Sequence, residues 1–363
     1  MKKPKKKLKV AILFGGKSVE HEVSLRSARN IAEAMDKDKY DIVFIGIDKK
    51  GNWLRLKKNP SLEGKSLVLA DSASTAFVPL DTRKIQAGES SLDGEVDVVF
   101  PVLHGTFGED GTVQGLLKLK GIPFVGCSVL GSAVAFDKDV TKRLLTEAGI
   151  PNSRYMTFKK GDVVSFSHAK KKLGLPLFIK PANSGSSVGV SKAATKAEFD
   201  RAVEQAFLFD RKILIEEFID GREVECAVLG NDDPVASVVG EVITNTAHGF
   251  YSYEAKYLDE NGAAIEIPAK LSKTVQTKIQ KLAVKTFQTL CCEGLSRVDC
   301  FVTKKGKIYV NEVNTLPGFT NISMYPSLWK ASGLSYSKLI DRLIMLAIER
   351  FTKEKKLRTS LEK

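Results

Sequence analysis

The sequence has little of what marks several large classes of protein. No run approaches the roughly 18 to 20 uncharged apolar residues of a membrane span, so we expect no transmembrane helix and no membrane partner. The basic N-terminal residues lead straight into an apolar segment with no small-residue cleavage site behind it, so we expect no secretory signal. Five cysteines without a CxxC pair and four histidines without ligand spacing indicate neither a disulfide framework nor a zinc site. These absences favour a cytoplasmic protein with reduced thiols.

Acidic side chains are in the minority, with 43 Asp+Glu against 56 Lys+Arg and a formal net charge of +13. Such an excess invites a nucleic-acid partner. The excess is concentrated at the two ends, however, because residues 1–9 hold six lysines and no acid, and residues 350–363 hold six basic and two acidic side chains. Charge of this kind is typical of solvated tails. We therefore expect basic tails at 1–8 and 353–363 and no nucleic-acid partner.

The rest of the composition is that of a globular protein, with 43% hydrophobic and 27% charged residues among 363. The length favours two or three domains. Short apolar strands at 9–14, 41–47 and 96–102 alternate with helical segments, which is typical of a parallel sheet that binds ligands at the carboxyl ends of its strands. Ser18 is the expected cap of a helix over 19–35.

We predict an α/β protein of three units, with residues 57–95 as an embellishment of the first unit. The predicted units are an N-terminal Rossmann-like, parallel-sheet domain over 1–135; a central domain over 136–217, with a helix at 138–148, a strand at 177–180 and a strand that ends at 213–217; and a C-terminal domain over 218–352, with strands near 223–229 and 235–243, an irregular loop at 245–268, a helix at 271–290 and a hairpin at 295–314.

The hairpin at 295–314 is the most informative segment, because two β-rich runs flank the turn signal Lys305-Gly306. A two-residue loop there would place Asp299 opposite Glu312, and one register would hold along the whole hairpin. The same register would place Arg297 opposite Asn314. Because side chains alternate between faces, all four would project from one side of the sheet.

Two opposed carboxylates repel each other and need a proton or a cation between them. The amide oxygen of Asn314 would complete an all-oxygen set that suits Mg²⁺, and Arg297 would supply a positive charge for a developing anion. Apolar neighbours on both faces imply burial, where carboxylates require a partner. Spacing by itself leaves open an ordinary surface hairpin with a salt-bridged face.

Lys180 ends another apolar strand, and the Ser/Gly-rich loop 181–189 follows it. The loop can offer N–H groups, hydroxyls and the ammonium group to phosphate oxygens, although it is no Walker A loop. A flexible linker is the alternative. Gly15-Gly16 is a weak dinucleotide signal without the full GxGxxG pattern, so an NAD-dependent dehydrogenase is a poor interpretation.

The motifs NSGSSVG, EEFIDGREVE, YEAKY, RVDCF and NEVNTLPGFT occur in this order, and the sequence thereby resembles the ATP-grasp ligases. With GGKSVEHEVS and HGTFGEDGTVQG it is similar to one branch, the D-alanine:D-alanine ligase family, over roughly 10–350. The resemblance implies a three-domain ATP-grasp architecture with ATP held between the second and third domains. It also implies ATP-dependent ligation of two D-alanines through an acyl phosphate, for peptidoglycan precursors. Related enzymes that use D-lactate or D-serine as second substrate are the alternative.

The resemblance further implies two Mg²⁺ ions, with Mn²⁺ as a substitute, and a homodimer. It assigns nucleotide binding to Lys138, Lys180, Ser186, Ser187, Glu216, Glu217, Phe218, Ile219, Glu223, Lys256, Asn311 and Glu312, and metal binding to Asp299, Glu312 and Asn314. It assigns catalytic roles to Glu20, His104, Ser186, Tyr257, Arg297 and Gly318, and substrate binding to Glu20, His104, Arg297, Gly318 and Ser323. Tyr257, where D-lactate-using relatives tend to carry Phe, favours an amine as second substrate.

Overall fold

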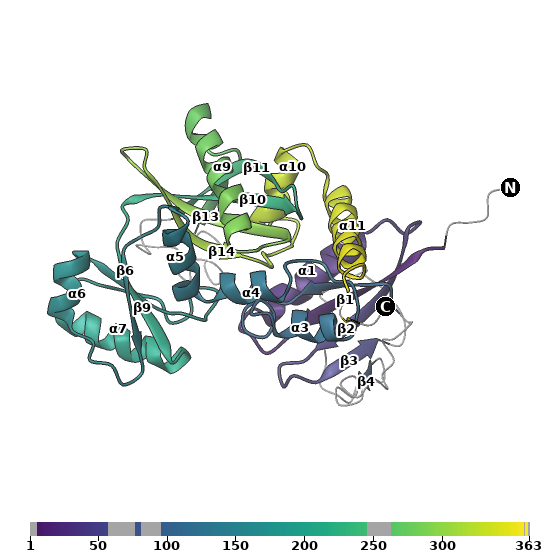
Figure 1. The fold of residues 1–363 in the computed structure, drawn as a ribbon, viewed down its shortest axis with the longest axis horizontal. Helices are drawn as coiled ribbons and strands as arrows, with labels where there is room; N and C mark the ends of the chain where they lie inside the picture. Colours follow the sequence, from purple (N-terminus) through teal and green to yellow (C-terminus); the bar gives the residue numbers. More distant parts are fainter. Residues whose placement is uncertain (1–5, 57–76, 81–95, 245–262, 359, 362–363) are drawn as a thin grey trace.

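A computed structural model describes residues 6–56, 77–80, 96–244, 263–358 and 360–361. Three sheets with flanking helices build the molecule (Figure 1). Within the described ranges, no helix has the length and apolar character needed to cross a membrane. Tyr257 and Lys256 lie outside the described residues, as does most of the segment 57–95.

The first sheet has the strand order β4-β3-β2-β1-β5. Its strands are β1 (Leu8–Gly15), β2 (Tyr40–Ile47), β3 (Trp53–Leu56), β4 (Phe77–Leu80) and β5 (Val98–Val102). β1 pairs in parallel with β2 and β5, as the alternating pattern predicts, whereas β2–β3 and β3–β4 pair antiparallel. The sheet is therefore mixed, and its parallel part lies at the strands that lead into the candidate site.

The helix after β1 begins later than predicted. α1 runs over His21–Ala34 with Glu20 at its N-cap, so the expectation that Ser18 caps the helix is wrong. Ser18 Oγ instead accepts a hydrogen bond from the backbone N–H of Glu20, at 3.2 Å. The Glu20 side chain makes no capping hydrogen bond with its helix. Its carboxylate is turned toward the neighbouring loops.

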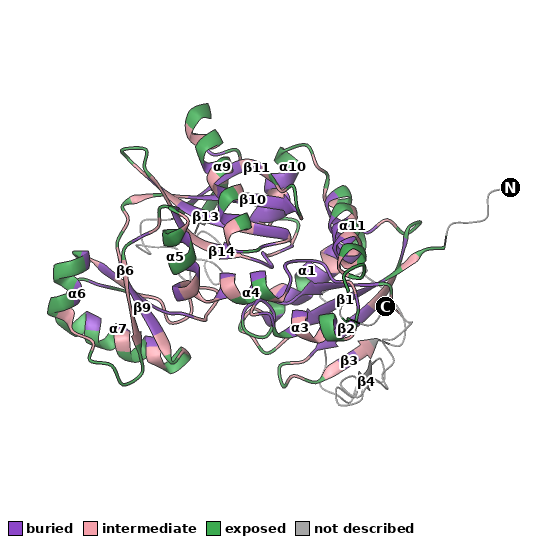
Figure 2. Ribbon diagram, in the orientation of Figure 1, coloured by how far each residue is buried: buried purple, intermediate pink, exposed green. Residues whose placement is uncertain are grey.

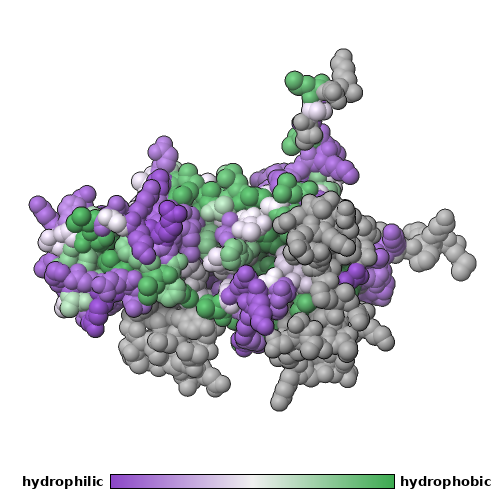
Figure 3. Space-filling view, turned by 90° about the horizontal axis from the view of Figure 1, so that it is seen from below, coloured by the Kyte–Doolittle hydropathy of each residue, from purple (hydrophilic) through white to green (hydrophobic). Residues whose placement is uncertain are grey.

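The second sheet has four strands in the order β6-β9-β7-β8, all antiparallel. These strands are β6 (Tyr155–Lys159), β7 (Leu177–Pro181), β8 (Ser191–Ala193) and β9 (Lys212–Glu217), and the helices of this segment are α5 (Lys138–Glu147), α6 (Phe166–Leu173) and α7 (Lys196–Phe209). The sheet has its own core, in which Ile179 and Phe199 are fully buried. Hydrophilic side chains are frequent on the face of this part seen in Figure 3, at the left.

The third sheet has the order β12-β11-β10-β13-β14. Its strands are β10 (Gly221–Gly230), β11 (Val235–Thr244), β12 (Ala263–Glu266), β13 (Gly294–Thr303) and β14 (Ile308–Asn314). The remaining helices are α3 (Thr112–Leu119), α4 (Val129–Phe136), α9 (Lys273–Thr289), α10 (Met324–Ala331) and α11 (Tyr336–Glu354). Residues 263–266 were expected in an irregular loop and form the edge strand β12 instead, because they pair with β11.

One hydrophobic core joins the first and third sheets. α11 contacts α1, α10, β5 and β13, and Ile12, Leu229 and Leu343 belong to the same buried cluster. Buried residues accordingly follow the strands and the inner faces of the helices in Figure 2. The shared core fixes the ends of β1 and β5 relative to the β13–β14 hairpin.

Residues 304–307 separate β13 from β14, and because Thr303 pairs with Lys307 the loop itself has three residues, 304–306, so the two-residue loop is wrong. Thr303 and Lys307 pair through the bond from Thr303 N–H to the Lys307 carbonyl, at 2.9 Å. Gly306 has φ +73°. A type I′ turn would require positive φ at Lys305 also, and Lys305 has none. The arrangement is a type I turn closed by a left-handed glycine.

A β-bulge at Asn311 offsets the additional loop residue. Pairs near the loop, such as Phe301 with Tyr309, are one residue out of the predicted register. After the register shift at Asn311, Asp299 lies opposite Glu312. The predicted pairs Asp299–Glu312 and Arg297–Asn314 are thus confirmed. The bulge also brings Asn311 and Glu312 together onto the wall of one cavity.

Gly306→Ala tests the loop geometry. A Cβ at Gly306 would meet no atom within 4 Å, so the expected loss of about 1 kcal/mol comes from the left-handed backbone conformation. The free energy of unfolding in urea measures this loss. Gly115→Ala is the control, since Gly115 lies inside α3 with open space at its Cβ, and there alanine should stabilise. Equal effects of the two substitutions would contradict the assigned loop.

Candidate active site

Two cavities meet beside the β13–β14 hairpin. The first has a volume of about 410 Å³ and lies between the second and third sheets. The second has a volume of about 820 Å³ and is lined by the start of α1, the loop at 104–109 and residues 316–324. Residues shared by the two walls are Glu109, Gly185, Ser186, Val242, Glu312 and Asn314. A ligand in one cavity can therefore reach a ligand in the other at these residues.

The described residues predicted to bind a nucleotide all line the first cavity: Lys138, Lys180, Ser186, Ser187, Glu216, Glu217, Phe218, Ile219, Glu223, Asn311 and Glu312. Lys256 is the remaining member of the predicted set and lies outside the described residues. The residues predicted to bind the amino-acid substrates line the second cavity: Glu20, His104, Arg297, Gly318 and Ser323. Tyr257 is the remaining catalytic prediction, also outside the described residues. The fold thus brings both predicted sets together.

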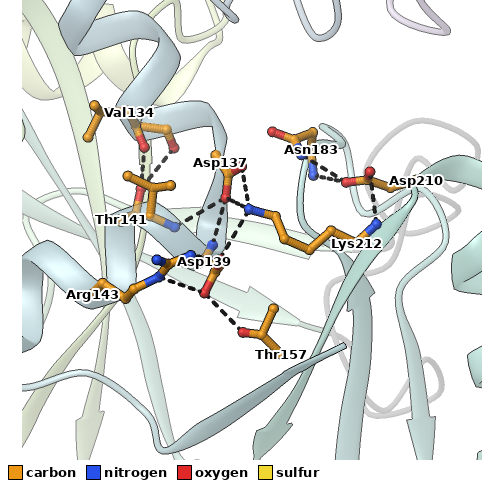
Figure 4. Close-up of polar contacts among 11 residues, drawn as sticks. Val134, Asp137, Asp139, Thr141, Arg143, Thr157, Asn183, Asp210 and Lys212 are labelled. Atoms are coloured by element: carbon orange, nitrogen blue, oxygen red, sulfur yellow. Dashed lines mark hydrogen bonds and ion pairs between the residues drawn. The ribbon is translucent and has the colours of Figure 1, made fainter. Parts of the chain in front are cut away.

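A polar network positions the start of α5 against the Ser/Gly-rich loop 181–189, the predicted phosphate loop (Figure 4). Asp137 caps α5 by accepting bonds from two backbone N–H groups. Lys212 Nζ lies 2.8 and 2.6 Å from the Asp137 carboxylate oxygens. Asp210 accepts hydrogen bonds from the N–H and the side-chain amide of Asn183, at 2.7 and 2.9 Å. β9, the phosphate loop and the first turn of α5 are therefore held together.

Lys138 is the first residue of α5, and its Nζ donates to the Ser184 carbonyl at 2.6 Å. Burial lowers the pKa of this lysine. Next in the loop, Ser186 and Ser187 have φ of 53° and 57°. Left-handed backbone conformations cost on the order of 1–2 kcal/mol for each such residue, and strained residues of this kind cluster at ligand clamps. The two serines lie against the first cavity.

Glu216 lines the first cavity and contacts two lysines, one at the end of β7 and one on α5. Its Oε1 lies 2.8 Å from Lys180 Nζ, and its Oε2 lies 3.4 Å from Lys142 Nζ. Burial acts to raise the pKa of Glu216, but the two lysines outweigh it and the pKa is lowered. Phe178 and Phe218 stack nearby, with ring centroids 6.0 Å apart, and both line the cavity. A flat apolar ring system fits beside an ionised acceptor here.

The hairpin carries a buried charge cluster. Arg297 donates from Nε and Nη2 to the two oxygens of Asp299, both at 2.7 Å, and its Nε lies 2.8 Å from Glu225. Burial acts to lower the pKa of Arg297, but the carboxylates of Asp299 and Glu225 raise it well above its ordinary value. Asn314 donates to Asp299 at 2.9 Å. Glu312, opposite Asp299, lines both cavities.

This donor set fits Mg²⁺, because it consists of two carboxylates and an amide, of which Glu312 and Asn314 line the first cavity. The described residues contain no cluster of three or more His, Cys, Asp and Glu side chains arranged for a metal ion. An oxygen site completed by an amide and by phosphate oxygens does not need such a cluster. Asp299, Glu312 and Asn314 are therefore the residues that would hold the ion.

The second cavity presents groups suited to an amino acid. Nδ1 of His104 lies 2.9 Å from the Leu316 carbonyl, so Nδ1 donates this hydrogen bond. Nε2 of the same ring is buried and has no hydrogen-bond partner in the described part of the chain. Ser323 is the N-cap of α10, where N–H groups and the helix dipole favour a carboxylate. A Cβ on Gly318 would approach Ser323 Oγ to 3.1 Å.

Sequence patterns missed three charged residues of the site: Glu109, Lys142 and Glu225. Glu109 is buried and accepts a hydrogen bond from the Gly105 N–H at 3.0 Å. Burial, together with the charge of Glu20, raises the pKa of Glu109 to about 8. The phosphate loop approaches both carboxylates, since a Cβ on Gly185 would lie 3.5 Å from Glu20 Oε2 and 4.0 Å from Glu109 Oε2. The HGTFGEDG motif contains Glu109, but Glu20, whose charge acts on it, lies at the N-cap of α1.

Two family descriptions match the chain in order. Residues 9–127 match the D-ala D-ala ligase N-terminus, and residues 144–345 match the D-ala D-ala ligase C-terminus. The chain belongs to the D-alanine–D-alanine ligase family. The predicted family, the ATP-grasp fold class and the enzyme class, a ligase, are confirmed.

Relatives in the D-alanine–D-alanine ligase family are similar over nearly the whole chain. The D-alanine–D-alanine ligase of Shouchella clausii is 52% identical over 98% of both chains. The D-alanine–D-alanine ligase A of Salmonella typhimurium is 50% identical, over 98% of this chain and 100% of its own.

Solved structures agree with this family assignment. The D-Ala:D-Ser ligase VanG of Enterococcus faecalis has a TM-score of 0.83 at 39% identity, covering 94% of this chain and 100% of its own. The D-alanine–D-alanine ligase of Bacillus anthracis, in complex with ATP, has a TM-score of 0.74 at 27% identity, covering 96% and 99%.

Glu109→Gln should change how stability of the ligand-free protein depends on pH. Glu109 holds a proton in the folded state up to about pH 8, whereas its ordinary pKa is 4.5. The folded state therefore binds more protons between these values, and its stability falls as the pH rises. Glutamine, which carries no charge, removes this fall. The free energy of unfolding of Glu109→Gln should therefore rise relative to that of the unaltered protein by up to about 1.4 kcal/mol for each pH unit between these values.

Urea denaturation at several pH values between 5 and 9 measures the difference. Glu147→Gln is the control, because Glu147 lies exposed at the end of α5, and its curve should run parallel to that of the unaltered protein. A Glu109→Gln curve parallel to both would contradict the assigned protonation.

Proposed function

We propose that this chain joins two D-alanine molecules into D-alanyl-D-alanine, with conversion of ATP to ADP and phosphate, for the synthesis of peptidoglycan precursors. The observation that carries the proposal is the meeting of two cavities at Ser186, Glu312 and Asn314. One cavity has the lysines and aromatic slot that suit a nucleotide, and the other has the groups that suit amino acids. Relatives about 50% identical are named D-alanine–D-alanine ligases.

In the proposed first step, the carboxylate of one D-alanine attacks the γ-phosphorus of ATP, and ADP leaves. Lys138 and Lys180 hold phosphate oxygens, and the loop serines close over them. Mg²⁺ bound by Asp299, Glu312 and Asn314 supplies charge neutralisation for the transferring phosphoryl group. Glu20 holds the ammonium group of the substrate. His104 lies beside the same substrate, and its buried Nε2 supports that placement.

In the second step, the amine of the other D-alanine attacks the carbonyl carbon of the acyl phosphate, loses a proton and displaces phosphate. Arg297 and the N–H of Gly318 stabilise the oxyanion of the tetrahedral intermediate. Ser323, at the start of α10, holds the carboxylate of the second D-alanine. That Arg297, Gly318 and Ser323 line one cavity supports their joint action on one intermediate. The positioning of two reactants accounts for much of the rate.

Several further features belong to the proposal. Glu216, Glu217, Phe218 and Ile219 line the adenine site, and Glu223 holds the ribose hydroxyls. The family resemblance assigns Tyr257 to a hydrogen-bonded set with Ser186 and Glu20, and Lys256 to the γ-phosphate. A second Mg²⁺, Mn²⁺ as a substitute, a homodimer and a cytoplasmic location follow from the family resemblance. The domains divide at 135/136, 217/218 and 352/353, which the segregation of β1–β5, β6–β9 and β10–β14 supports.

Product analysis tests the function. With ATP and Mg²⁺, we expect ADP and phosphate to form in equal amounts with D-alanyl-D-alanine, and only when D-alanine is present. Mass spectrometry of the product and a coupled ADP assay measure this. Equal turnover with L-alanine, or without an amino acid, would refute the proposal.

Use of D-serine as the second substrate is the alternative function. The similar fold of VanG, a D-Ala:D-Ser ligase, is the observation in its favour. Competition between D-alanine and D-serine, and in parallel D-lactate, for the second position separates the alternatives. We expect D-alanyl-D-alanine to predominate at equal concentrations. A mixed product rich in D-serine or D-lactate would replace the main assignment.

Asp299→Asn and Glu312→Gln test the metal site. Each should lower kcat/KM by at least about 100-fold, which is the scale for removal of one preorganised charge-stabilising group. Circular dichroism should show an unchanged fold, because each amide keeps the shape of the carboxylate it replaces. Asp232→Asn, at an exposed turn, is the matched control and should keep full activity. Full activity of either site variant at saturating Mg²⁺ would remove that residue from the site.

A further inference from the structure

Lys142 is a buried lysine to which the proposed mechanism gives no part. It lies on α5, one turn after Lys138, and its side chain is 1% exposed. Its Nζ lies 2.7 Å from Ser153 Oγ, 3.4 Å from Glu216 Oε2 and 5.4 Å from the centre of the Tyr155 ring. Burial lowers the pKa of Lys142 to about 8. A buried cation destabilises the fold unless hydrogen bonds and opposite charges compensate for its lost hydration.

Lys142 belongs to a directed chain of hydrogen bonds. An ammonium group can only donate, so Lys142 Nζ donates to Ser153 Oγ. Ser153 Oγ in turn donates to Glu216 Oε2 at 2.9 Å. Lys180 approaches the other oxygen of the same carboxylate. The Glu216 carboxylate is thus held from two sides, and neither oxygen can turn away without losing a charged contact.

The chain of contacts ends at the nucleotide cavity. Ser153 and Glu216 line that cavity, whereas Lys142 lies behind them and outside its wall. Lys142 therefore positions groups of the cavity wall through its contacts with these two residues. Glu216 continues along β9 into Glu217 and Phe218, which form the wall around the stacked aromatic pair.

The chemistry of purine bases gives this arrangement a use. Adenine carries an amino group at C6, which donates hydrogen bonds, whereas guanine carries an oxygen there, which accepts them. An ionised carboxylate only accepts. A carboxylate that faces C6 of the base and is kept ionised and in one orientation therefore favours adenine, and a loose or protonated one discriminates less.

We propose that Lys142 is a positioning residue that acts through Ser153 to hold Glu216 as an ionised acceptor, and thereby gives the nucleotide cavity its preference for adenine over guanine. The proposal rests on the proposed use of ATP, and it adds a residue that determines which nucleotide is accepted. Lys180 shares the same carboxylate, so base recognition and phosphate binding meet at Glu216.

Lys142→Met is the main test, because methionine fills a similar volume without charge. Calorimetry with ATP and with GTP, in the presence of Mg²⁺ and the absence of D-alanine, gives binding without turnover. The Kd for ATP should rise about 10-fold, the scale for a weakened hydrogen bond to a charged group, and the Kd for GTP should stay within about 2-fold. In ligation assays KM for ATP should rise while kcat at saturating ATP changes little. A purely structural role of Lys142 would weaken both nucleotides alike.

Two further variants keep the proposal falsifiable. Lys196→Met removes a lysine of α7 that pairs on the surface with Asp200, and it should leave both Kd values unchanged. Ser153→Ala breaks the same chain at its middle and should lower the preference for ATP in the same direction. If Lys142→Met does not fold, Ser153→Ala decides the question. The double variant should be no worse than the Lys142→Met single variant, since both act on one carboxylate.

The outcomes separate this proposal from the proposed function. Equal shifts for ATP and GTP, or no shift in either, would overturn the role of Lys142 while ligation by the unaltered protein stands. An unaltered protein that prefers ATP but forms no D-alanyl-D-alanine would overturn the function and leave Lys142 supported. An unaltered protein that binds GTP as tightly as ATP would overturn the role of Lys142 directly.

Discussion

Arg297 lies inside the third sheet between the carboxylates of Asp299 and Glu225, and much of the site depends on this contact. Charges taken out of water destabilise a fold unless they are paired. Asp299 and Glu225 share one guanidinium, and Glu312 lies opposite Asp299 on the neighbouring strand. This concentration of carboxylates is what suits the hairpin to a cation. Since Glu312 and Asn314 line both cavities, ligands of the two cavities would meet at these residues.

Anion binding in this molecule depends on individually placed cations rather than on the net charge of +13. Lys138 is held by α5 and the phosphate loop, and Lys180 is held by Glu216. Each is fixed by segments that are distant in the sequence. The shared core of the first and third sheets then sets where the amino-acid cavity lies relative to these lysines. Position, set by packing, decides which charges contact a ligand.

Local patterns predict local features of this protein well. Apolar runs locate β1, β2 and β5, and strand alternation places Asp299 opposite Glu312. Ser18 has capping chemistry but lies outside the helix, because the chain turns at Glu20 before α1 begins. Glu109 and Lys142 could not be recognised from the sequence, since burial and partners from other segments give them their properties. The bulge at Asn311 was equally hidden, because no glycine or other local signal marks it.

In the β13–β14 hairpin, the predicted strand pairing is correct beyond the bulge and wrong by one residue next to the loop. Which face of a strand a residue occupies is a matter of parity. The loop adds one residue to the count and the bulge adds another, so the parity of Glu312 and Asn314 is restored. Strand pairing beyond the bulge therefore depends on the loop and the bulge together. Among related hairpins, alignments anchored on the charged pairs rather than on the turn glycine will match equivalent residues.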